Sequence, residues 1–122
     1  MLRLTALVFV LLAGSALAQE AMTGDELEAL LGDDRTISLG GPGAGYTGEL
    51  ALKSDGTATG TAKTDKGEVM QIDGLWYIEG NKFCRTWKSI DGGKEVCETW
   101  IKDGENKVRV LVDGKEIGTN HW

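Results

Sequence analysis

The chain is poor in the residues from which most catalytic and metal sites are built. Its 122 residues include one histidine, two cysteines and one proline. A catalytic triad needs a base, and the single histidine, His121, is next to last in the sequence, a position typical of an exposed tail. Two thiolates alone do not complete the four ligands that zinc usually takes. We therefore expect no catalytic residue, no metal site and no cofactor, and we interpret the protein as non-enzymatic.

Basic residues are also scarce. Lysine and arginine together number 13 against 19 acidic residues, which gives a net charge of −6. Nucleic-acid binding relies on basic side chains to neutralise phosphates, so we expect no nucleic-acid partner. The carboxylates fall mostly in turns and on the polar faces of strands, and no pair stands out as the acid and nucleophile of a glycosidase.

A glycine-rich segment, 40–45, lacks what a phosphate-binding loop requires. A Walker loop continues into a Lys-Ser/Thr pair and a helix, whereas Tyr46-Thr47 begins a strand-like pattern here. The segment is interpreted as a plain loop, and it holds the only proline, Pro42.

The first eighteen residues have the features of a signal peptide. Arg3 precedes an apolar run over 4–12, and Ala16 and Ala18 stand at the −3 and −1 positions before Gln19. A short membrane anchor is the alternative, but the run is shorter than the roughly 20 residues of a span. We expect residues 1–18 to be removed near Ala18/Gln19. The mature protein would then have no membrane span and would be periplasmic or secreted.

Residues 19–122 form one expected domain, in which 19–34 make an N-terminal arm and helix. Thr23 and Glu26 have the spacing of a capping box, in which each side chain bonds the other's backbone N–H. One apolar helical stripe follows, and Gly32 is a natural stop. The stripe consists of Leu27, Leu30 and Leu31.

From Arg35 onward the apolar residues alternate with polar ones, which is typical of strands with one dry face. Asp-Gly pairs, which favour tight turns, punctuate this region. They are Asp55-Gly56, Asp73-Gly74, Asp91-Gly92, Asp103-Gly104 and Asp113-Gly114. The sequence predicts an all-β fold, an antiparallel up-and-down barrel of seven to nine strands with one short N-terminal helix. A two-sheet sandwich is the alternative.

The two cysteines, Cys84 and Cys97, predict one disulfide, because a lone pair in an exported protein is most simply bridged. Placing them directly opposite one another centres the connecting turn between Ile90 and Asp91, where the turn residues lie. The disulfide and the turn thus predict the same hairpin register.

This register places a mainly aromatic face inside the barrel, opposite small residues of an earlier strand. The small residues are Ala58, Gly60 and Ala62. The candidate ligand-binding residues on the larger face are Trp76, Arg85, Trp87, Glu98 and Trp100. Arg85 and Glu98 would either face inward as partners or form a solvated pair near the rim. The small side would either be filled by the indoles or leave a pocket beside them.

The sequence around Cys84 resembles that of known proteins. The elements Gly74-Leu75-Trp76, Gly80-Asn81-Lys82 and Cys84, with a second cysteine soon after, resemble small secreted β-proteins of alphaproteobacteria that have no assigned function. The resemblance implies a lipocalin-like or streptavidin-like barrel with one disulfide. The Gly-x-Trp element also resembles that of calycins, where it opens the first strand instead of falling in mid-chain. A weaker similarity, carried by Trp76, Gly80 and Cys84, is to secreted β-barrel inhibitors of bacterial metalloproteases.

Two functions remain as expectations. The first is an exported binding module that holds a small apolar ligand in the barrel. The second is a periplasmic interaction protein or protease inhibitor that uses its N-terminal arm or loops on a partner protein. A hollow interior would favour the first, and a filled core with a free arm at 19–22 would favour the second.

Overall fold

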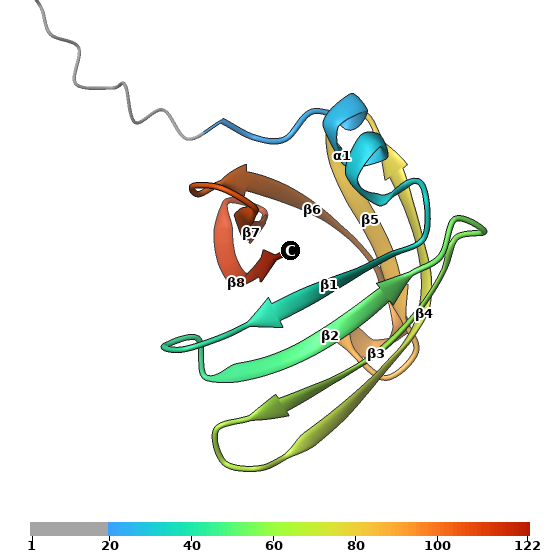
Figure 1. Ribbon diagram of the computed structural model, residues 1–122. Helices are drawn as coiled ribbons and strands as arrows, with labels where there is room; N and C mark the ends of the chain where they lie inside the picture. Colours follow the sequence, from blue (N-terminus) through green and yellow to red (C-terminus); the bar gives the residue numbers. More distant parts are fainter. Residues whose placement is uncertain (1–19) are drawn as a thin grey trace, which may run out of the picture.

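The computed structural model describes residues 20–122, which form an eight-stranded closed antiparallel barrel with one short α-helix (Figure 1). Residues 1–18, the predicted signal peptide, and Gln19 lie outside the described residues. The helix and strands are α1 (Gly24–Leu31), β1 (Arg35–Gly40), β2 (Tyr46–Leu52), β3 (Thr57–Thr64), β4 (Val69–Glu79), β5 (Lys82–Trp87), β6 (Glu95–Lys102), β7 (Lys107–Val112) and β8 (Lys115–His121). Each strand pairs with the next, and β1 also pairs with β8. The predicted barrel is therefore confirmed, and the sandwich alternative is wrong.

The up-and-down order puts the connections at two ends of the barrel. The turns at 53–56, 80–81 and 103–106 lie at the end that carries α1, which we call the helix end. The segments 41–45, 65–68, 88–94 and 113–114 lie at the other end, which we call the loop end. A single turn of 3₁₀ helix, η2 (Asp91–Gly93), interrupts the β5–β6 connection. Within residues 20–122, no helix is both long and apolar enough to cross a bilayer.

Helix α1 closes the helix end. Its predicted capping box is present: the Thr23 hydroxyl accepts the Glu26 N–H at 3.2 Å, and the Glu26 carboxylate accepts the Thr23 N–H at 3.2 Å. Leu27 and Leu31 are fully buried beneath the helix. A helix this short is unstable alone, so the docking of these two leucines holds it in place.

Four of the five Asp-Gly pairs lie in connections, but Asp73-Gly74 lies inside β4. The turn expected at this pair is therefore wrong. A Cβ at Gly74 would clash with the Thr86 carbonyl oxygen and come within 3.0 Å of the Trp87 ring. The glycine permits close approach between β4 and β5 here, which is a packing role and not a turn role.

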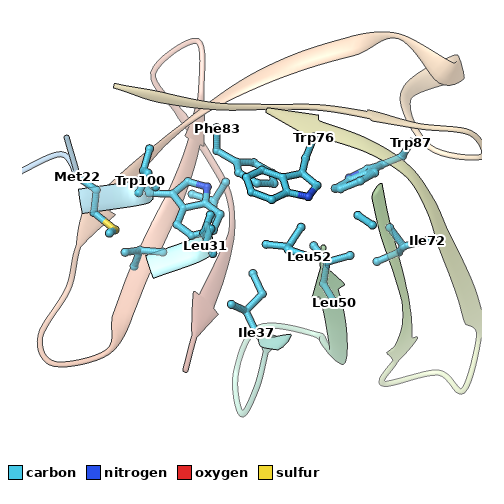
Figure 2. Close-up of a cluster of buried hydrophobic side chains, with 14 of the residues drawn as sticks. Met22, Leu31, Ile37, Leu50, Leu52, Ile72, Trp76, Phe83, Trp87 and Trp100 are labelled. Carbon is cyan, nitrogen blue, oxygen red and sulfur yellow. The ribbon is translucent and has the colours of Figure 1, made fainter. Parts of the chain in front are cut away.

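The helix half of the barrel is solidly filled. Figure 2 shows Phe83 beside Trp76, with Trp100 toward Leu31 and Met22. The ring centroids of Trp76 and Phe83 are 5.8 Å apart, and those of Phe83 and Trp100 are 5.0 Å apart. These rings form a floor that separates α1 from the loop end.

Candidate ligand-binding cavity

Strands β5 and β6 bring the candidate site residues to the inner wall. The register pairs Cys84 with Cys97 directly, as predicted, and their sulfur atoms are bonded. With the disulfide on the outer face, alternation turns Arg85 and Glu98 inward. Both are almost completely buried, with 5% and 7% of their surface exposed. The solvated rim pair considered from the sequence is therefore wrong.

The Arg85 side chain is held by two carboxylates. Its Nε donates to Glu98 Oε2 at 2.9 Å, and its Nη1 donates to Asp91 Oδ2 at 2.5 Å. Asp91 comes from the β5–β6 connection and is half exposed. The guanidinium carbon also lies 5.7 Å from the centre of the Trp87 ring, within the range of a cation–π contact. The single positive charge of this cluster is thus already matched.

Glu98 has partners on both carboxylate oxygens. Oε2 accepts from Arg85, and Oε1 accepts from the Trp100 indole N–H at 2.9 Å. Burial raises the pKa of Glu98 because it disfavours the charged form, while Arg85 and the Trp100 N–H act in the opposite direction. The carboxyl can therefore take a proton more readily than an exposed glutamate.

A cavity of about 320 Å³ lies above the aromatic floor, toward the loop end. Four of the five predicted ligand-binding residues line it, namely Arg85, Trp87, Glu98 and Trp100. Ala62 lines the opposite side, so one of the small residues predicted to leave space does so. Trp76 is not in the lining. Its indole N–H instead donates to the carbonyl oxygens of Lys53 and Thr57 at 3.0 and 3.1 Å, which fixes it near the helix end.

Most of the other lining residues were missed in the sequence, and two of them, Tyr46 and Asn120, carry polar side chains at the β1–β8 seam. The Tyr46 hydroxyl accepts the Thr119 N–H at 3.2 Å and lies against Gly118, where a Cβ would clash with it. Tyr46 thereby bridges β2 and β8 across the short β1–β8 seam, which has only two register pairs. Continuing the alternation from the Asp113-Gly114 turn into β8 would place Thr119 on the inner face. A register shift at Val110/Leu111 instead pairs Val108 with Asn120 and turns Asn120 inward, so the alternation could not have found it.

The lining combines a large apolar area with a small number of polar side chains. Most of the wall is apolar, and a few polar groups gather on it, which is how small-molecule sites are usually built. Within residues 20–122, no three histidine, cysteine, aspartate or glutamate side chains come together in a way that could hold a metal ion.

Comparison with protein-family models, with curated proteins and with solved structures finds no match to this chain.

Proposed function

We propose that this protein is an exported, non-enzymatic binding module that holds a small, mainly apolar molecule in the cavity at the loop end of its barrel. The observation that carries the proposal is the cavity itself, which stays hollow although the other half of the barrel is filled. Its volume of about 320 Å³ lies at the lower end of the usual range for ligand sites. At about 30 Å³ for each water-sized group, it has room for on the order of ten non-hydrogen atoms.

The N-terminal arm supports this function over that of an inhibitor. Met22 N donates to the Trp100 carbonyl at 2.7 Å, and Lys102 N donates to the Glu20 carbonyl at 2.8 Å. Met22 is also buried. An arm that is bonded to β6 is not free to insert into a partner's active site, so residues 20–22 give no support to an inhibitor. Export and the likeness to secreted alphaproteobacterial barrels remain part of the proposal.

Filling the cavity tests the proposal. Ala62→Leu adds volume to the lining, and Ala51→Leu makes the same change on the outward face of the neighbouring β2, where it is a matched control. Calorimetry and tryptophan fluorescence with hexane and octanol as probes should give saturable binding to the wild type and to Ala51→Leu. Binding to Ala62→Leu should be weaker by about tenfold or more, the equivalent of about 1.4 kcal/mol. Failure of both probes to bind the wild type, or equal binding to Ala62→Leu, would refute the proposed function.

A further inference from the structure

The polar side chain of Asn120 lies in the cavity wall without a partner. Only 7% of its surface is exposed, and its carboxamide forms no hydrogen bond with residues 20–122. Its register neighbours on the two adjacent strands are Leu39 and Val108, whose side chains offer no hydrogen bond. A carboxamide carries two donors and an acceptor, and burial without partners costs free energy.

The amide of Asn120 still has access to the interior of the cavity. Among residues 20–122, Arg109 Nε is the one side-chain nitrogen or oxygen atom that is both inaccessible to solvent and without a hydrogen-bond partner. The Asn120 atoms are therefore not sealed, and the space that Asn120 lines is the cavity. Its hydrogen-bonding capacity is therefore available to a molecule that occupies the cavity.

The charges around the cavity decide what kind of polar group this occupant can carry. Arg85 is the only basic residue of the lining, and it is paired with Glu98 and Asp91. The three groups are together neutral when Glu98 is protonated and negative when it is ionised. In neither state does the wall offer an unmatched positive charge to a buried anion. An ammonium group would lose its hydration on burial, and the two carboxylates that could compensate this loss are already engaged by Arg85 and, for Glu98, by the Trp100 indole N–H.

The apolar part of the occupant has its place at the loop end. Met70 and Ile117 line the cavity there and are 41% and 49% exposed, and Ile90 lies in the adjoining β5–β6 connection. An apolar rim above a polar group deeper in the wall suits a molecule that enters with its polar end first.

We propose that the ligand is a neutral amphiphile, bound head first, whose hydroxyl or carboxamide head hydrogen-bonds to Asn120 and whose alkyl chain runs along the apolar wall toward the loop end. This inference rests on the proposed function and narrows it to one class of ligand.

A series of probes with one chain length and different heads tests this ligand class. Octanol and octanamide carry neutral heads, whereas octanoate and octylamine are charged at neutral pH. We expect the two neutral probes to bind the wild-type protein at least about tenfold more tightly than the two charged probes, as measured by calorimetry. Octanoate or octylamine binding as tightly as octanol would overturn the inference.

Replacement of Asn120 tests the contact itself. In Asn120→Leu, octanol and octanamide should lose about tenfold in affinity, while hexane, which has no head, should bind as tightly as before. Gln71→Leu is the matched control, because this amide lies exposed on the outer face of β4. Asn120→Ala removes the amide without adding volume and should show the same loss, should the leucine variant prove unstable.

The possible outcomes separate the two proposals. Absence of binding by every probe, hexane included, refutes the proposed function. Binding of all probes with similar affinity, or unchanged octanol and octanamide affinity in Asn120→Leu and Asn120→Ala, refutes the neutral-head inference and leaves the binding module intact.

Discussion

The carboxyl of Glu98 is a titratable group in the barrel interior, with 7% of its surface exposed. Its pKa is raised above the ordinary 4.5, chiefly because the charged form is desolvated. In the unfolded chain the same group titrates normally, so the folded state binds its proton more tightly. Below the pKa that Glu98 has in the unfolded chain, this proton contributes its full stabilisation to the folded state. The stabilisation is lost as the pH rises through the higher pKa that Glu98 has in the folded protein.

Glu98→Gln should therefore abolish the part of the stability that the wild type loses as the pH rises. Glutamine keeps the shape and can still accept from Arg85, but it does not titrate. As the pH is raised from about 4.5 to about 8, the free energy of unfolding of the wild type should fall relative to that of the variant. Urea denaturation at several pH values measures this difference. Glu105→Gln in the exposed β6–β7 turn is the control, and an equal trend in both variants would contradict the assignment to Glu98.

At the residue scale the sequence predicted which side chains face inward but not how deep they lie. The Cys84–Cys97 register was enough to turn Arg85 and Glu98 toward the interior. Their depth depends on how far each strand is displaced along the barrel wall, and no local pattern encodes that displacement. The seam contact of Tyr46 with β8 escaped prediction for the same reason, since it joins residues far apart in the sequence.

Among the elements, α1 shows which features a local sequence pattern predicts and which depend on tertiary packing. Its start and stop were predicted from Thr23, Glu26 and Gly32 and are confirmed. Its docking site was not predictable, because it consists of side chains from several strands. The Glu26 carboxylate also pairs with Lys102 of β6, which lowers the pKa of Glu26 and ties the first turn of the helix to the barrel.

Leu27→Ala should destabilise the barrel by about 2–5 kcal/mol, since it removes a fully buried side chain and leaves a cavity under the helix. Leu30→Ala, in the same helix but only partly buried, should cost clearly less. Thermal and urea unfolding followed by circular dichroism compare the two. Equal losses would mean that the helix contributes little through its buried stripe.

The long strand β4 shows where local reasoning fails. Asp73-Gly74 has the composition of a turn, yet the chain runs straight through it because Gly74 lies against Thr86 and the Trp87 ring. Packing between strands overrides the turn preference of the dipeptide. The same closeness helps to place Trp87 in the cavity wall.

For the molecule as a whole, alternation and turn spacing predicted an antiparallel barrel, because one-sided strands must bury their apolar face and a closed sheet does so without a second layer. The state of the interior was not predictable. Whether small residues such as Ala62 leave space beside the indoles depends on the barrel's width and on α1, which fills only one end.

The signal peptide predicted over residues 1–18 gives a prediction for the whole molecule. When the chain is expressed with residues 1–18 in a bacterial host, the exported protein should begin at Gln19, because Ala16 and Ala18 fit the cleavage site. Intact-mass measurement of the exported fraction checks this. A mature species that retains Met1 would show that the segment is not cleaved.

The short β1–β8 seam affects how this protein behaves beside its own copies. β1 pairs with β8 only at Ser38–His121 and Leu39–Asn120, so within residues 20–122 the first half of β8 has no strand on that side. Unpaired backbone of this kind is a template for strand addition between molecules. The half-exposed side chain of Ile117 adds apolar surface that favours such association. Lys115 and Glu116 begin the same strand and are exposed. Charged side chains in this position discourage sheet growth, so we expect colloidal stability at high concentration to depend on Lys115 and Glu116, which directly precede Ile117 at the cavity rim.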